Sequence, residues 1–307
     1  MVNLLPSYAE TFNPGSSGWF DSSLESLDEA AYKAYVEQYC EKVLSQVKGE
    51  KWLSMDSYPI NADESLTGNF LFDLAVLKYY SMQYDAHAHA VLQSSGWTEG
   101  SSSLKNRMPT EAEMRMQAYA AMAFGMDSIS WWSYSDKRED NQSNPTDSDE
   151  YYNRFANVNK ELSAISAVYS AFDWKGVILG AGKDNGTLFT PDEDYEAYNI
   201  VKGQIGDYEL SASDTKLLSG VSTNKGNWNY LMGVMEDMNG NEGYVLCNYN
   251  SHEEDRAQTL TLTFDANVTE VVIYRGGDAK TVTVSNKTLT IDLATGEGVI
   301  VLPSKIG

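Results

Sequence analysis

The stretch DAHAHAVLQSSGW, residues 85–97, decides the fold predicted for the first half of the chain. Its centre has the length and composition of a short buried strand, which stops at Gln93 and breaks into a Ser-Ser-Gly-Trp turn. The segments 69–84 and 109–125, on either side, have apolar residues at helical spacing. A strand between two long helices is typical of an α/β fold with parallel strands.

The same alternation of short apolar runs and amphipathic segments extends from the N-terminus to about residue 174. The predicted strands are 2–8, 51–60, 87–94 and 127–134, and the predicted helices are 28–48, 69–84, 109–125 and 151–172. The helix over 109–125 has the clearest ends, because Thr110 and Glu113 form a capping-box pattern and Gly125 is a C-terminal stop. These consecutive β-then-α units predict a parallel sheet with its helices outside.

The second half of the chain changes to short strands that alternate threonine with aliphatic residues. Segments 230–237 and 244–250 predict a hairpin around the turn MNGNEG. Five further strands follow at short spacing, at 258–265, 269–275, 280–285, 287–293 and 298–303. The pattern predicts two domains, a β/α segment over 1–174 and an antiparallel β-sandwich over 175–307.

Composition excludes several classes of partner. The chain has 22 basic and 44 acidic residues, a formal net charge of −22, whereas nucleic acid or an anionic membrane needs a basic surface. No segment approaches the roughly 18 apolar residues of a membrane span. There is no phosphate-binding loop or nucleophile elbow, so we expect no cofactor. Residues 1–10 lack the features of a signal peptide, and the signal for the expected bacterial extracellular or cell-surface location would lie upstream of residue 1.

A set of motifs in a fixed order carries a family resemblance. The motifs are NLLPSY (3–8), LSMDSYP (53–59), VLQSSGW (91–97), EMRMQAYAAMAFGMDSIS (113–130) and WWSY (131–134). In order and spacing they resemble the last four β/α units of a clan-A glycoside hydrolase barrel of the bacterial β-galactosidase type, which a β-sandwich normally follows. The resemblance implies that the predicted strands are barrel strands five to eight. It also implies a glycoside hydrolase-like protein that acts on or binds a carbohydrate.

The chain departs from that family at the catalytic carboxylates. The resemblance implies an acid/base glutamate on strand four, which this chain lacks, and a nucleophile at the end of strand seven. At that place the sequence reads Leu92-Gln93-Ser94, and an amide neither ionises nor attacks carbon. Glycoside hydrolysis ordinarily uses two carboxyl groups, about 5 Å apart in retaining enzymes and further apart in inverting ones. The family's pair is therefore missing.

Asp56 is the candidate catalytic residue. Alternation places it on one face of its strand with Ser54 and Tyr58, near the carboxyl end, where barrel active sites lie. One interpretation is a site carboxylate that holds sugar hydroxyls or acts as acid or base. The other is a strand-end aspartate that caps a turn or pairs with a neighbour. The loop acids Glu99, Asp136, Glu139 and Asp140 can also reach the site, although most loop acids are simply solvated.

Aromatic and amide side chains near the same strand ends are the candidate substrate-binding residues. They are Tyr58, His89, Gln93, Trp97, Trp131 and Tyr134. Trp131 and Trp132 alternate faces, so we expect one of them, with Trp131 as the candidate, to stack on a sugar ring while the other packs under the outer helices. Trp97 is a second stacking candidate, although each such residue taken singly is more often part of a core. His87 and His89 have the i, i+2 spacing of two metal ligands, but no third ligand lies at a supportive spacing, so we expect no metal.

Three interpretations of function remain open. The chain is the C-terminal part of a glycoside hydrolase-like enzyme, in which Asp56 or a loop acid takes the second catalytic role. Alternatively, it is a non-catalytic carbohydrate-binding remnant, or a fragment without activity of its own. Because half a barrel exposes two sheet edges, we also expect either a homodimer or a separate N-terminal barrel half as partner.

Overall fold

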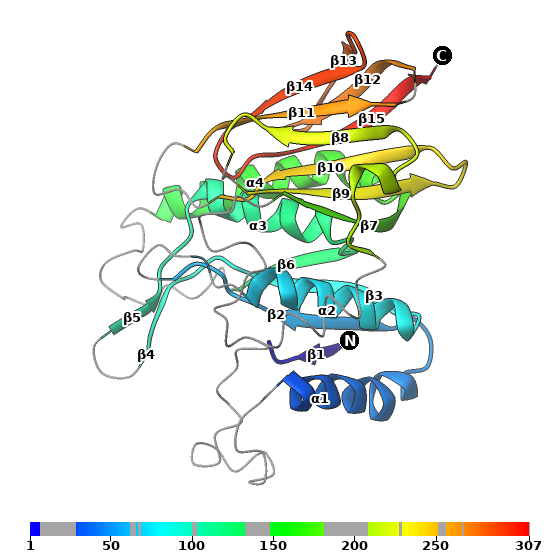
Figure 1. Cartoon of the computed structure of the whole chain (residues 1–307). Helices are drawn as coiled ribbons and strands as arrows, with labels where there is room; N and C mark the ends of the chain where they lie inside the picture. Colours follow the sequence, from blue (N-terminus) through cyan, green and yellow to red (C-terminus); the bar gives the residue numbers. More distant parts are fainter. Residues whose placement is uncertain are drawn as a thin grey trace.

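The computed structural model describes residues 1–6, 29–61, 66, 69–99, 103–132, 148–180, 208–226, 229–250, 256–265 and 267–306. Figure 1 shows a parallel sheet in the lower half, antiparallel sheets in the upper half, and a helical layer between them. The predicted combination of an α/β part with an antiparallel β-sandwich is confirmed. The division into domains at residue 174, and the assignment of the first part as half a barrel, stay predictions.

The parallel sheet is built from four strands in the order β1-β2-β3-β6, and every neighbouring pair is parallel. Its strands are β1 (Val2–Leu4), β2 (Trp52–Asp56), β3 (His87–Gln93) and β6 (Ser128–Trp132). The register places Asn3, Ser54, His89 and Ser128 side by side in one row across the sheet. Since neighbouring residues along a strand point to opposite faces, this row belongs to a single face.

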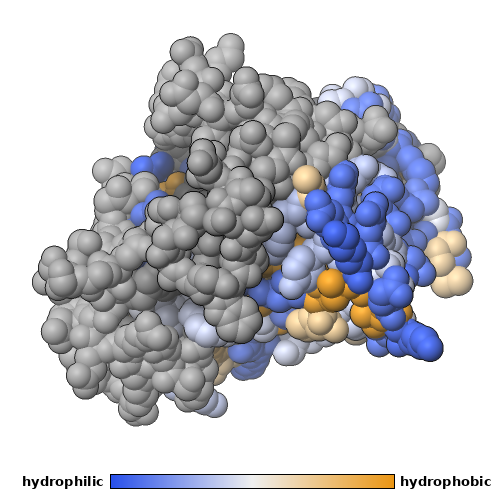
Figure 2. Space-filling view, turned by 90° about the horizontal axis from the view of Figure 1, so that it is seen from below, coloured by the Kyte–Doolittle hydropathy of each residue, from blue (hydrophilic) through white to orange (hydrophobic). Residues whose placement is uncertain are grey.

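The other face of the sheet is apolar and covered by helices. Met55, Ala90 and Leu92 point toward α2 (Asn69–Gln83), whose residues Phe70 and Leu77 pack against them. The remaining helices are α1 (Glu29–Lys42), followed by the 3-10 turn η2 (Leu44–Gln46), α3 (Glu111–Ala123) and α4 (Ser148–Tyr169). Figure 2 shows the underside of the molecule, where hydrophilic residues surround small hydrophobic areas.

Two antiparallel sheets enclose the second core. One sheet has the order β13-β12-β15-β10-β9-β7 and the other the order β14-β11-β8. The strands are β7 (Phe172–Gly180), β8 (Leu218–Thr223), β9 (Tyr230–Asp237), β10 (Glu242–Asn248), β11 (Gln258–Phe264), β12 (Val268–Arg275), β13 (Asp278–Thr283), β14 (Thr288–Leu293) and β15 (Gly298–Ile306), and a 3-10 turn η4 covers Ala212–Asp214. Met232, Leu246, Leu262 and Ile291 from both sheets meet in one hydrophobic cluster, which is the arrangement of a sandwich.

Helix α3 joins the two halves because it packs against strands of both. On the sandwich side it lies so close to β9 and β15 that Gly233 and Gly298 have no room for a Cβ atom. The indole of Trp174 on β7 donates to the carbonyl of Ala123, 2.8 Å away, at the end of the helix. The two halves therefore share one hydrophobic cluster, to which α3 contributes most of its length, including Tyr119.

Local signals located most elements, and three features were not predicted. The capping box of Thr110 and Glu113 is present, and Gly125 adopts a positive φ of 73° just after α3. The three unpredicted features are β7, β8 and the two-stranded ribbon of β4 (Trp97–Glu99) and β5 (Ser103–Asn106). β7 begins at Phe172, inside the segment predicted as the last helix, since α4 already ends at Tyr169.

Candidate functional site

The candidate site is the face of the parallel sheet opposite α2, toward the carboxyl ends of its strands. Alternation places Asn3, Ser54, Asp56, His89 and Trp132 on this face. We call these five residues the polar face. Hydroxyl, amide, carboxylate, imidazole and indole groups thus come from all four strands of one rigid sheet.

Asp56 is the last residue of β2 and is half-buried. Its Oδ1 accepts a hydrogen bond of 2.7 Å from the side-chain amide of Asn3 on β1. The phenol of Tyr35 on α1 lies nearby and accepts from the backbone N–H of Leu5, at 2.9 Å. Burial, with a smaller contribution from charges that include Asp56, raises the pKa of Tyr35, so this group stays a neutral phenol. Asp56 is therefore held by an amide donor and keeps oxygen lone pairs for another donor.

Ser54 and His89 form a second polar pair, one row nearer the middle of the sheet. The Ser54 hydroxyl and His89 Nδ1 are 2.7 Å apart, and both residues are buried. Burial lowers the pKa of His89, so its imidazole is neutral near pH 7. A neutral imidazole supplies one donor and one acceptor, and Ser54 occupies one of them.

The two neighbouring tryptophans of β6 take opposite faces, and the expected one does not reach the polar face. The Trp131 indole donates to Asn159 on α4, at 2.9 Å, and its ring meets Phe155 edge-on. Trp131 is half-buried on the α4 side of the sheet, and its predicted stacking on a sugar stays a prediction. Trp132 lies on the polar face instead, and 48% of its surface is exposed.

Gln93 also differs from its predicted role, because the side chain is fully buried. Its Oε1 accepts from the Ile60 N–H at 2.8 Å, and its Nε2 donates to the carbonyls of Arg107 at 2.8 Å, Ile60 at 3.1 Å and Ser95 at 3.3 Å. The Gln93 backbone is in turn held by the amide of Gln117 on α3. Because no atom of the Gln93 side chain is exposed, it cannot contact a ligand in this structure. Its hydrogen bonds instead link the loops that contain Ile60, Ser95 and Arg107.

The remaining predicted residues are placed only in part. Tyr58 follows β2 and is half-buried, with its carbonyl 3.4 Å from the amide nitrogen of Asn106. Trp97 begins β4, but its side chain lies outside the described part of the chain, as does the whole of Tyr134. Their predicted contacts with substrate stay predictions.

The second histidine of β3 lies at the opposite end of the strand from the site. His87 Nε2 is 3.3 Å from Glu50, and its ring is 4.7 Å from that of Trp52. Among the residues that the structure describes, no group of three or more His, Cys, Asp and Glu side chains is placed to hold a metal ion. Likewise, no helix in the described ranges is long and apolar enough to cross a membrane.

The arrangement suits hydrogen bonding and stacking better than hydrolysis. In the described part of the polar face, Asp56 is the single carboxylate, whereas hydrolysis ordinarily needs two. Sequence reasoning missed Asn3 and Trp132 as site residues. The alternation of β6 allowed either tryptophan to face the site, and only the register with β2 brings Asn3 to Asp56.

Comparisons with known proteins show resemblance in structure alone. No protein-family model matches the sequence, and no curated protein matches it. Among solved structures, the chain is similar to a rhamnosidase from Novosphingobium sp. PP1Y, with 10% identity and a TM-score of 0.48, over 83% of this chain and 35% of that one. It is also similar to a GH30 endoxylanase from Clostridium papyrosolvens C71, with 11% identity and a TM-score of 0.35, over 83% and 49%.

A third similar structure is a putative alpha-galactosidase from Bacteroides fragilis, with 12% identity and a TM-score of 0.28, over 92% of this chain and 76% of that one. The chain thus spans about half the length of the endoxylanase (49%) and about a third of the rhamnosidase (35%). All three are glycoside-acting enzymes by name. The low identities and TM-scores carry no argument for a particular activity of this chain.

Proposed function

We propose that this chain binds a carbohydrate on the polar face of its parallel sheet, at the carboxyl ends of the strands. The Asn3–Asp56 pair, 2.7 Å apart at those strand ends, carries the proposal. A carboxylate and an amide side by side offer both acceptors and donors, which is what vicinal sugar hydroxyls require. The ends of parallel strands are also where barrel proteins place their ligands.

Trp132 adds an apolar surface for the ring of a sugar. It lies on β6, two strands away from Asp56 on β2, which corresponds to about 10 Å across the sheet. A ligand of two linked sugar rings spans such a distance. The neutral Ser54–His89 pair lies one row nearer the middle of the sheet on the same face, where both residues are buried beneath Asp56.

By its family resemblance the chain descends from a glycoside hydrolase. Binding without turnover is the function that the geometry supports best, because Asp56 has no second carboxylate beside it on the described face. Hydrolysis would need an acid from another part of the chain or from a partner, and it is the alternative outcome of the test below.

The test is a panel of nitrophenyl glycosides of galactose, glucose and xylose, measured for binding by calorimetry and for release of nitrophenol. We expect binding that weakens about tenfold or more in Asp56→Asn, the loss of a charge-assisted hydrogen bond. Asp85→Asn is the matched control, because Asp85 is exposed at the amino end of β3. Equal binding by wild type and Asp56→Asn would refute the proposed site, and turnover that Asp56→Asn abolishes would favour the enzyme.

We also propose that the edge of the parallel sheet pairs with a second copy or with a separate barrel half. No strand in the described ranges pairs with the outer edges of β1 or β6. Tyr39 on α1, the helix next to β1 in Figure 1, and Val43 just after this helix are 36% and 44% exposed. Light scattering at micromolar concentration tests this part, and a monodisperse monomer would refute self-association.

A further inference from the structure

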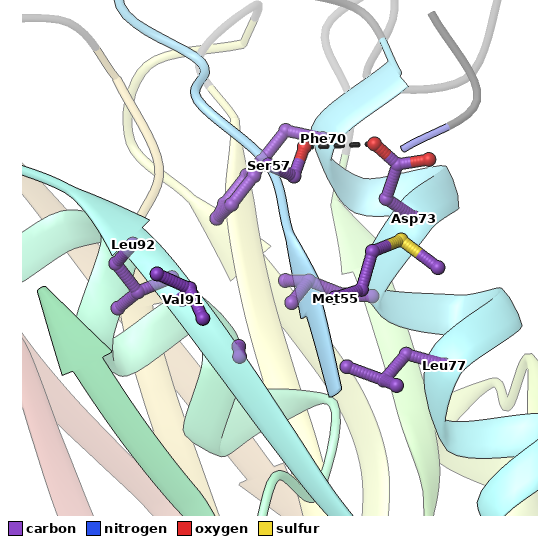
Figure 3. A pocket seen from close by; sticks show the side chains of 9 residues that line it. Met55, Ser57, Phe70, Asp73, Leu77, Val91 and Leu92 are labelled. Atoms are coloured by element: carbon purple, nitrogen blue, oxygen red, sulfur yellow. Dashed lines mark hydrogen bonds between the residues drawn. The ribbon is translucent and has the colours of Figure 1, made fainter. Parts of the chain in front are cut away.

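A buried carboxylate lies directly behind the candidate site. Asp73 on α2 is 1% exposed and lines a crevice between α2, β2 and β3 (Figure 3). The other lining side chains are almost all apolar, among them Met55, Phe70, Leu74, Leu77 and Leu92. The crevice leaves essentially no volume for a water molecule. A carboxylate in such surroundings is unfavourable unless protein groups donate hydrogen bonds to it.

One of those donors is the residue next to Asp56. The Ser57 hydroxyl donates to Asp73 Oδ2 at 2.7 Å, the bond drawn as a dashed line in Figure 3. The backbone N–H of Ser57 donates to the Val91 carbonyl of β3, at 3.2 Å. Ser57 is therefore held from two directions, by α2 through its side chain and by β3 through its backbone.

Fixing Ser57 also fixes the direction of Asp56. Asp56 is the last residue of β2, and beyond it the chain is still joined to β3 through the Ser57 N–H bond to Val91. Because successive side chains point to opposite faces, a Ser57 held against α2 turns Asp56 toward the polar face and Asn3. Without the bond to Asp73, the Ser57 backbone has only its contact with β3 to prevent rotation.

We propose that Asp73 is a positioning residue, which through Ser57 holds the Asp56 carboxylate in the orientation that meets Asn3 and the ligand. This inference rests on the proposed carbohydrate site. Stability alone does not require Asp73, since replacing both partners of a buried hydrogen bond by apolar side chains of similar shape can be nearly neutral or stabilising. An aspartate in this crevice is better explained by the direction that it gives to the neighbouring strand end.

A double-mutant cycle on the full chain separates positioning from general stabilisation. The affinity for the tightest-binding nitrophenyl glycoside of the panel is measured for Asp73→Ala and Ser57→Ala, alone and in the Asp56→Asn background. Each variant alone should weaken binding about tenfold, while in the Asp56→Asn background the change should stay within about twofold. Asp73→Asn keeps an acceptor for Ser57 and should recover most of the affinity, and Ser57→Ala carries the test if Asp73→Ala fails to fold.

The matched control is Leu77→Val, one helical turn from Asp73 in the same crevice, which should lower stability but leave affinity unchanged. A second readout needs no ligand, namely the NMR signal of the Asn3 side-chain amide. It should shift in Asp73→Ala and Ser57→Ala but not in Leu77→Val. A loss of affinity that is equal in both backgrounds, or an unmoved Asn3 signal, would overturn the positioning role. If no glycoside binds the wild type while the Asn3 signal shifts as expected, the proposed function fails and the positioning of Asp56 stands.

Discussion

Replacing Gln93 by glutamate would put a carboxyl group where the resembled family carries its nucleophile, and we expect this change to destabilise the protein. The Gln93 amide is fully buried and donates to the carbonyls of Arg107 at 2.8 Å and Ile60 at 3.1 Å. A carboxylate cannot donate, so both bonds are lost and two negatively polarised oxygens face the new charge. The charge is thus placed where it meets acceptors rather than donors.

The size of the effect depends on pH. The loss of one or two neutral hydrogen bonds contributes about 1 kcal/mol even when Glu is protonated. Burial should raise the pKa of the new carboxyl in the folded state by about 3 units above its unfolded value of about 4.3. A carboxyl group whose pKa is higher in the folded than in the unfolded state adds no pH-dependent penalty below the unfolded pKa. As pH rises from the unfolded pKa to the folded pKa, the unfolded chain ionises first and the folded state loses stability. At about 1.4 kcal/mol per pH unit, the total penalty is about 2 kcal/mol at pH 5 and about 5 kcal/mol at pH 8.

Urea unfolding of the wild type and Gln93→Glu at pH 5 and pH 8 measures this difference. Gln93→Leu removes the same donors without adding charge, so its penalty should not change with pH. Gln83→Glu on the exposed end of α2 makes the same chemical change in solvent and should stay within about 0.5 kcal/mol of the wild type. A Gln93→Glu protein as stable as the wild type at pH 8, or one that gains hydrolysis, would show that the side chain reaches the polar face and would refute this account.

Three further expectations follow from the site. Trp132→Ala should weaken glycoside binding about fivefold with little change in stability, whereas Trp131→Ala should lose about 1 to 2 kcal/mol of unfolding free energy, as measured by urea titration, because its half-buried ring packs edge-on against Phe155 of α4. Calorimetry should find nitrophenyl β-glucuronide binding about tenfold more weakly than nitrophenyl β-glucoside, since the Asp56 carboxylate repels the uronate, and Asp56→Asn should remove that discrimination. Burial lowers the folded pKa of His89, so the wild type should lose stability as pH falls below the unfolded value of about 6.5, and urea titrations of His89→Gln between pH 7.5 and 5 should show a shallower loss.

Features set by neighbouring residues could be predicted from the sequence. The capping box at Thr110 depends on a residue three positions away, and the β11 segment alternates threonine and apolar residues over its length. Alternation also put Asp56 on one face with Ser54, near the carboxyl end of a strand predicted over 51–60, and the observed β2 ends at Asp56 itself. These signals lie within one turn or one strand, where the chain itself fixes the geometry.

Features set by distant residues could not be predicted. Gln93 is held by Ile60, which is 33 residues away, and by the Arg107 carbonyl, so its burial depends on how three loops meet. Which of two adjacent tryptophans faces the site was decided by Asn159 and Phe155 of α4. The pattern of a strand shows which side chains share a face. Only the packing of a helix that comes later in the chain, here α4, determines which of the two faces is covered.

The close contact of α3 with the sandwich has a consequence for any attempt to exchange parts of this protein. Gly233 and Gly298 let the helix rest directly on β9 and β15, and a side chain at either glycine would collide with Ala123 or Tyr119. A sandwich borrowed from another protein would have to reproduce both gaps and the Trp174 contact. Exchange of the sandwich alone is therefore blocked at this joint unless the donor sequence brings its own matching helix.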